Sequence, residues 1–159
     1  MKILKLLALG VLGLAFTASA QAANVLETMK RDPNLSIFVG MIEKAGVGNQ
    51  LAGTQQVTVL APTNGAFDMV GPSDLRGIES NQDRLRSFVL GHVLSGARTA
   101  LFGTEHNMAS ARTLSGSTIE IQGTSMGSGM INNHVKVVQG DIRTDNGVIH
   151  KIDHPLGVR

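Results

Sequence analysis

The chain has 159 residues, 42% of them hydrophobic, with 14 lysines and arginines against 12 aspartates and glutamates and no cysteine, tryptophan or tyrosine. Without cysteine there is no disulfide framework and no thiolate metal site, so packing alone must stabilise the fold. A nearly balanced charge and 3% aromatic residues exclude the basic surface and the stacking platforms of a nucleic-acid-binding protein.

Residues 1–22 predict a secretory signal peptide, because a basic start, an apolar run over residues 6–16 and a stretch of small residues follow one another. Ala18-Ser19-Ala20 and Ala20-Gln21-Ala22 both fit the cleavage pattern, and we favour the second. Two of the 14 basic side chains lie in this segment, so 12 remain against 12 acidic ones. The mature chain is therefore formally neutral.

The compact signal is typical of bacterial export, and we expect a periplasmic or extracellular protein. No later apolar run approaches the roughly 20 residues that cross a bilayer, so we expect no transmembrane segment after cleavage. We detect no internal repeat and no interdomain linker. Residues 23–159 are therefore expected to form one domain.

The mature chain begins with two helical patterns. Asn24 followed by Glu27 forms a capping box that predicts a short helix through Lys30. Asp32-Pro33 then begins a second helix, with the proline at its first position, and Gly46 ends it. The buried stripe of this second helix falls at helical spacing and comprises Leu35, Phe38, Val39 and Ile42.

A strand and a short helix follow. Residues 55–60 are rich in β-prone side chains, and Pro62 stops this strand because it cannot donate to a ladder. Thr63 or Asn64 then caps a short helix in which Phe67 is buried.

A longer helix opens at Ser80, with Asp83 three residues later. Beyond Leu94 the apolar period changes from 3.6 to 2, which predicts antiparallel strands. The apolar face of the helix comprises Leu85, Phe88, Val89 and His92. We expect the strands at residues 113–114, 118–122, 135–138, 141–144 and 148–153. Helices first and antiparallel strands later predict an α+β fold.

Asp145-Asn146-Gly147 predicts the tight hairpin between the last two strands, because Asn and Gly accept positive φ. The hairpin fixes the register, and it places Val148, His150 and Ile152 on one face of the final strand. On this reasoning, Gly147 is required for its backbone conformation.

Three possible chemical activities, namely metal binding, acid-base catalysis and nucleophilic catalysis, have little support in the sequence. His150 and His154 share a face of an extended segment, but a zinc site needs a third ligand that the spacing does not supply. Asp141 and Asp145 resemble paired carboxylates, although they flank a turn in which Asp is common. The chain has no cysteine and no Gly-x-Ser-x-Gly elbow. We therefore expect no metal, no cofactor and no enzymatic activity.

Four motifs in a fixed order are more specific for a protein family than any of these residue pairs is for an activity. They are TVLAPTNGAFDMV (58–70), LRSFVLGHVLSG (85–96), TLSGSTIEI (113–121) and GDIRTDNGVIHKIDHPL (140–156). This series resembles a fasciclin domain over residues 24–156. The resemblance implies a wedge of about seven mainly antiparallel strands with flanking α-helices, in which the first and last motifs lie side by side.

The resemblance also implies a function, because fasciclin domains are mostly non-enzymatic adhesion and interaction modules. We accordingly expect a protein or polysaccharide partner at the cell envelope. Asp141-Ile142 matches a pair implicated in adhesion in animal members of the family. A second adhesive motif has a Tyr-His pair where this chain has Gly91-His92, so only His92 carries over. The alternative reading of Asp141-Ile142 is structural, as the start of an edge strand with a buried isoleucine.

A different class of function remains open, in which the domain binds a small apolar ligand such as a lipid or pigment. Met108, Met126 and Met130 lie in or near loops, and methionines line adaptable apolar surfaces as well as filling core gaps. A third reading is a metal-dependent enzyme on the face that carries His150 and His154.

Overall fold

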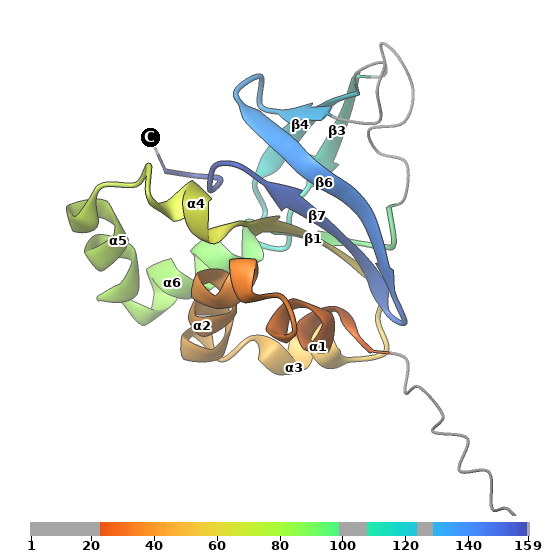
Figure 1. Ribbon diagram of the computed structural model, residues 1–159, viewed down its shortest axis with the longest axis horizontal. Coiled ribbons are helices and arrows are strands. Elements are labelled where there is room, and N and C mark those ends of the chain that lie inside the picture. Colours follow the sequence, from red (N-terminus) through yellow and green to blue (C-terminus); the bar gives the residue numbers. More distant parts are fainter. Residues whose placement is uncertain (1–22, 99–107, 124–128, 159) are drawn as a thin grey trace, which may run out of the picture.

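In the computed structural model, which describes residues 23–98, 108–123 and 129–158, helices pack against one side of a curved sheet (Figure 1). The expected signal peptide and Met126 lie outside these residues. The helices are α1 (Val25–Lys30), the 3-10 helix η1 (Pro33–Leu35), α2 (Ser36–Ala45), α3 (Gly48–Ala52), α4 (Asn64–Phe67), α5 (Pro72–Glu79) and α6 (Gln82–Leu90). The strands are β1 (Val57–Pro62), β2 (Val93–Ser95), β3 (Met108–Arg112), β4 (Thr118–Gly123), β5 (Gly129–Ile131), β6 (Val135–Thr144) and β7 (Gly147–Ile152).

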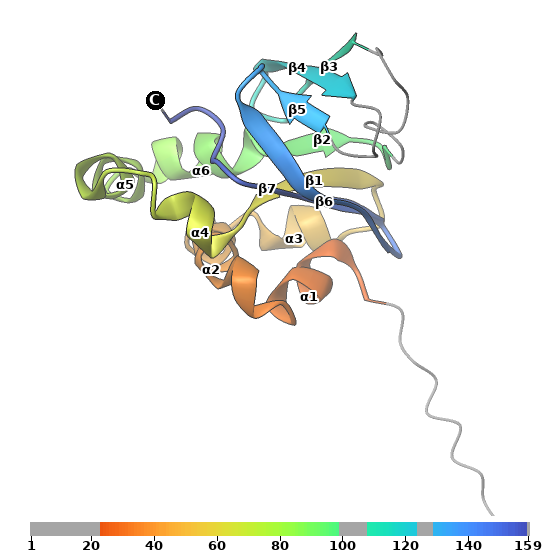
Figure 2. The same cartoon turned by 45° about the horizontal axis from the view of Figure 1, so that its top comes forward.

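The seven strands form one sheet in the order β2-β1-β7-β6-β5-β4-β3, and β1 and β7 are its parallel pair. Their register runs from Val57 opposite Gly147 to Pro62 opposite Ile152. The first and last motifs therefore lie side by side, as expected. The mainly antiparallel sheet and its flanking helices confirm the predicted fold class (Figure 2).

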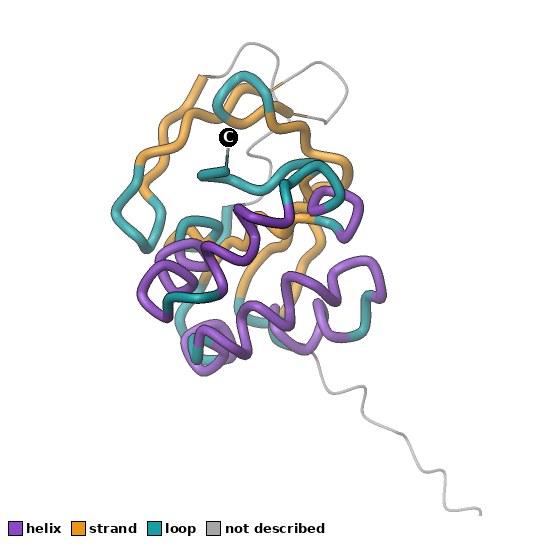
Figure 3. Tube along the Cα trace, turned by 90° about the vertical axis from the view of Figure 1, so that its left-hand side faces the viewer, coloured by secondary structure: helices purple, strands orange, loops and turns teal. Residues whose placement is uncertain are grey.

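The two faces of the sheet bury different clusters of apolar side chains. Val57 and Val59 of β1 pack with the helices, whereas Leu60 packs on the opposite face with residues from β3 to β6. This alternation is the period-2 pattern that the sequence shows. Figure 3 shows the helices gathered on one side and the strands arching over the other.

The helix boundaries differ slightly from those expected. Asn81, rather than Ser80, is the N-cap of α6, and its Oδ1 accepts hydrogen bonds from the N–H groups of Asp83 and Arg84 at 2.9 and 3.0 Å. An asparagine oxygen satisfies N-terminal amides as well as a serine does. Two short helices, α3 and α5, were not expected. α3 buries only Leu51, and α5 has only two apolar side chains at helical spacing, the partly buried Leu75 and Ile78.

The two strands expected at residues 135–138 and 141–144 are one continuous strand, β6. Its pairing with β7 shifts register between Val137 and Gln139 and again between Gln139 and Ile142. Asp141 has a φ of 55° at the second irregularity. Gly140 therefore marks a bulge that bends the strand rather than a turn that ends it.

Asn64 has a longer-range role than the expected cap. Thr63 occupies the N-cap position of α4, but its side chain makes no capping hydrogen bond. The amide of Asn64 instead accepts from the N–H of Ile37 and donates to Pro33 O and Ser36 Oγ, at 3.0 to 3.1 Å. It therefore fastens α4 to the start of α2. Phe67, as expected, is buried in the helix-side core.

The expected backbone reason for Gly147 is wrong. Neither Asn146 nor Gly147 has a positive φ, and the two-residue loop Asp145-Asn146 joins Thr144 to Gly147. Gly147 lies against β1 instead, where a Cβ atom would be 1.9 Å from Val57 O. The glycine is required because two backbones approach closely, which is the second common use of this residue.

Candidate functional site

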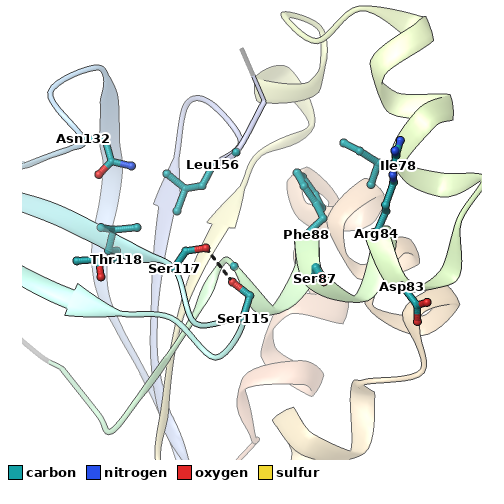
Figure 4. A pocket seen from close by; sticks show the side chains of 13 residues that line it. Ile78, Asp83, Arg84, Ser87, Phe88, Ser115, Ser117, Thr118, Asn132 and Leu156 are labelled. Atoms are coloured by element: carbon teal, nitrogen blue, oxygen red, sulfur yellow. Dashed lines mark hydrogen bonds between the residues drawn. The ribbon is translucent and has the colours of Figure 1, made fainter.

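A cleft of about 580 Å³ separates α6 from the turn between β3 and β4 (Figure 4). Phe88 and Ser87 form the helical side, and Ser115 and Ser117 face them from the turn. Leu156, from the segment after β7, lies between the two sides. The volume falls within the range of small-molecule sites, about 300 to 1,000 Å³.

Backbone hydrogen bonds hold the turn beside α6. The N–H of Ser115 donates to Leu90 O at 3.3 Å, and the N–H of Leu114 donates to Val93 O at 2.8 Å. Gly116 has a φ of 91° at the tip, a conformation that glycine adopts without strain. Main-chain hydrogen bonds thus hold this side of the cleft beside the end of α6.

The side of the cleft that the β3–β4 turn forms is polar. Thr113 Oγ1 donates to Ser117 O at 3.1 Å and lies 2.9 Å from Ser115 Oγ. Asn132 uses its Oδ1 to accept from the N–H of Glu120 at 2.9 Å, which leaves its NH₂ group directed to the cleft side. Hydroxyl and amide groups therefore face the aromatic ring of Phe88 across the gap.

His92 lies behind the helical wall and is fully buried, which corrects the expectation that it contacts a partner directly. Its Nδ1 donates to Phe88 O at 2.8 Å, and its Nε2 accepts from the N–H of Leu156 at 2.8 Å. Its ring also packs between those of Phe38 and Phe88, with centroids 5.3 and 4.7 Å away. His92 consequently positions two residues that line the cleft.

These hydrogen bonds require a neutral imidazole with its proton on Nδ1. Burial lowers the pKa of His92 from 6.5 to about 4, because loss of solvation disfavours the charged form of the ring. The hydrogen bond to Phe88 O opposes this effect only partly.

We expect the free energy of unfolding to fall as the pH is lowered from about 6.5 to about 4. In that window the unfolded chain binds a proton at His92 that the folded chain does not, which costs up to about 3 kcal/mol. Burial also lowers the pKa of His150, so protonation of this residue in the unfolded chain reduces the free energy of unfolding further. Urea titrations at pH 7.5 and 4.5 measure the difference.

A His92→Gln variant should lose most of this pH dependence, since glutamine keeps a donor and an acceptor but does not titrate here. His134→Gln, at an exposed histidine, is the matched control and should keep it. A His92→Gln variant with the full wild-type dependence on pH would show that another group is responsible.

Asp141, Ile142 and His150 lie together, away from the cleft lining. His150 is buried, its Nδ1 accepts from the N–H of Asp141 at 3.1 Å, and its Nε2 donates to Arg98 O at 3.0 Å. Asp141 is exposed, whereas Ile142 is half-buried and packs against the helix-side core. The structural reading of the Asp-Ile pair fits only in part, because the pair lies within β6 rather than at the start of a strand and Ile142 is half-buried. The hydrogen bond between Asp141 and His150 spans the bulge of β6.

The metal reading receives no support from the part of the chain that is described. His154 Nδ1 lies 2.9 Å from Asp153 Oδ1, whereas His150 is fully buried. Within residues 23–98, 108–123 and 129–158, no three His, Asp or Glu side chains gather in a way that could hold an ion. A third ligand is what a zinc site most needs.

Sequence reasoning assigned the cleft residues to other roles. Ser115 and Ser117 fall in the turn between the strands expected at 113–114 and 118–122, and Phe88 falls on the apolar face expected for its helix. Each assignment is locally correct, since the serines do form a turn and Phe88 does pack on the core. That the turn and the helix face one another depends on the path of the chain between them, and no motif signalled it.

The family model of the fasciclin domain matches residues 33–158, and the chain therefore belongs to the fasciclin-domain family. Transforming growth factor-beta-induced protein ig-h3 from Sus scrofa is 30% identical over 135 residues, which cover 84% of this chain and 19% of that protein. The uncharacterized protein sll1735 from Synechocystis is 28% identical over 133 residues, covering 84% and 96%.

A solved structure agrees with these sequence matches. A FAS1 domain pair from the insect cell adhesion molecule Fasciclin I superposes with a TM-score of 0.64 at 21% identity, covering 84% of this chain and 50% of that one. The chain thus spans a small part of ig-h3 and half of the insect pair. Among the described residues, none of the helices combines the length and apolarity needed to cross a membrane.

Proposed function

We propose that the protein is exported and acts as a non-catalytic interaction module, which binds a protein or polysaccharide partner at the cell envelope. The cleft between α6 and the β3–β4 turn is the observation that carries this proposal, because it is open, its two sides are joined by main-chain hydrogen bonds, and it is lined by both apolar and hydrogen-bonding groups. Membership of the fasciclin family supports it, since the insect neighbour is a cell adhesion molecule.

Photo-crosslinking in intact cells tests the proposal. A photoreactive amino acid replaces Ser117, which is exposed in the cleft, or Glu43, which is exposed on α2 away from it. We expect a recurring protein or glycan adduct from position 117 and not from position 43. Identical adducts from both positions, or none from either, would contradict an interaction through the cleft.

A small apolar ligand, such as a lipid or pigment, is the second candidate. The observation that favours it is the apolar part of the cleft, where Phe88, Ile119 and Leu156 meet. Met108 is 66% exposed and Met130 is half-buried, and neither methionine lines the cleft. Native mass spectrometry of protein purified from its source should then show a co-purifying mass, and a clean mass of the chain alone argues against this candidate.

A further inference from the structure

We infer that the cleft selects a small neutral aromatic compound that carries a hydroxyl or carbonyl group, with its ring placed against Phe88. The inference rests on the second candidate function and names the chemistry of the ligand. Four features of the cleft carry it: an aromatic stack that ends at the cleft, the open floor at Gly91, the polar wall of the turn, and the balance of charge at the rim.

The aromatic stack runs from the core to the cleft. Phe38 and His92 are fully buried, and His92 packs in turn on Phe88, which is half-buried at the cleft surface. The rings are tilted by 57° to 58° at centroid distances of 4.7 to 5.3 Å, the range that aromatic pairs prefer. A ligand ring on the open side of Phe88 would extend this series by one member.

Gly91 leaves the floor of the cleft open. Its φ of −66° is one that any residue adopts, so the backbone conformation does not require glycine. A Cβ atom there would lie 3.5 Å from Ser115 Oγ, and also 3.1 and 3.2 Å from the carbonyl oxygens of Ser87 and Phe88. Any larger side chain at this position would extend between the helix and the turn, where we place the ligand.

Hydrogen-bonding groups lie opposite the ring. Ser117 Oγ is 3.4 Å from Ser115 Oγ, and its own proton has no acceptor among the described residues. The NH₂ group of Asn132 likewise has no acceptor there, because only its oxygen is engaged. Both groups can donate to a hydroxyl or carbonyl oxygen on the edge of a ring that packs on Phe88.

The charges at the rim favour a neutral ligand. Asp83 and Arg84 both line the cleft, one of each sign, and in the described part of the chain neither forms an ion pair. Asp83 points away from the centre of the cleft, and Arg84 extends beyond Phe88 beside Ile78 (Figure 4). A ligand with a net charge would gain little from such a balanced pair.

Calorimetric titration of the mature protein with 2-naphthol and its saturated counterpart 2-decalol tests the inference. We expect 2-naphthol to bind about fivefold more tightly, as aromatic pairing supplies more than buried area alone. Phe88→Leu should reduce this preference below about twofold, whereas Phe67→Leu, at a buried ring outside the cleft, should keep it. Thermal melting of both variants checks that they remain folded.

A second variant changes Ser117, whose side chain is exposed, so we expect no effect on folding. Ser117→Ala should weaken 2-naphthol several-fold and leave 2-methylnaphthalene, which has no hydroxyl, unchanged. Ser73→Ala, at an exposed serine of α5 outside the cleft, is its control. Together the two variants separate recognition of the ring from recognition of its substituent.

Equal affinities for 2-naphthol and 2-decalol, or no binding of either, would overturn the inference. So would tighter binding of N-acetyl-tyrosinamide, because the ring would then belong to the side chain of a protein partner. The proposed functions are tested by other experiments. Crosslinking tests the interaction with a protein or polysaccharide partner, and native mass spectrometry tests whether any small apolar ligand is bound.

Discussion

Gly147→Ala should destabilise the protein by about 4 kcal/mol or more and leave much of the chain unfolded. The added Cβ atom would lie 1.9 Å from Val57 O and 2.9 Å from the carbonyl carbon of the same residue. Real Cβ contacts essentially never fall below 3.0 Å. Backbone atoms cannot rotate away as a side chain can, so β1 and β7 would have to separate at the start of their parallel register. Urea denaturation measures the loss.

Gly40→Ala is the matched control. Gly40 lies within α2, and nothing approaches the position of its missing Cβ within 4 Å. Alanine should therefore stabilise the protein by about 0.5 to 1 kcal/mol through its helix propensity. If Gly147→Ala unfolds at the same urea concentration as the wild type, the close approach of β1 and β7 is wrong.

Asn146→Asp is expected to cost about 3 kcal/mol, although the side chains have the same shape. Asn146 is 6% exposed, its Oδ1 accepts from the N–H of Val25 at 2.9 Å, and its Nδ2 donates to Leu51 O at 2.7 Å and Gly53 O at 2.9 Å. A carboxylate would keep the first bond but would place a buried negative charge against two carbonyl oxygens. Urea denaturation at pH 7.5 measures the cost.

Asn132→Asp provides the comparison, because Asn132 uses only its oxygen, toward the N–H of Glu120. A carboxylate preserves that bond, and aspartate tolerates the φ of 51° at this position, so we expect a change below about 1 kcal/mol. Equal losses in the two variants would mean that the NH₂ bonds of Asn146 contribute nothing to stability.

Local features of the fold were predictable because their causes lie within a few residues. The Asn24 cap places an oxygen 2.9 Å from the N–H of Glu27, and Gly46 ends α2 with a φ of 68°, both as the sequence patterns indicate. Along β1, the alternation between the two cores follows directly from the pleat of a strand. The order of the four motifs carried the resemblance to the family, and the parallel pairing of β1 and β7 agrees with it.

The candidate site and the buried polar contacts of the core were less predictable, because their residues interact with partners far away in the sequence. Asn146 forms a hydrogen bond with Val25, 121 residues away in the sequence, and His92 forms one with Leu156, 64 residues away. His92 drew attention as a binding residue, but its full burial makes it a residue that positions the cleft instead. A pattern in the sequence identifies a residue type suited to such a role, and it does not identify the partner.

The sequence by itself therefore determined the Asn24 cap, the end of α2 at Gly46, the strand alternation, the final hairpin and the family. Only the tertiary structure decided why Gly147 must be glycine, what the amide of Asn146 holds together, and that a serine turn faces Phe88 across a cleft. The physical reason is that propensity and periodicity express short-range interactions along the chain. Close contacts and cavities, in contrast, arise where segments distant in sequence meet, and their geometry depends on the packing of every element between them.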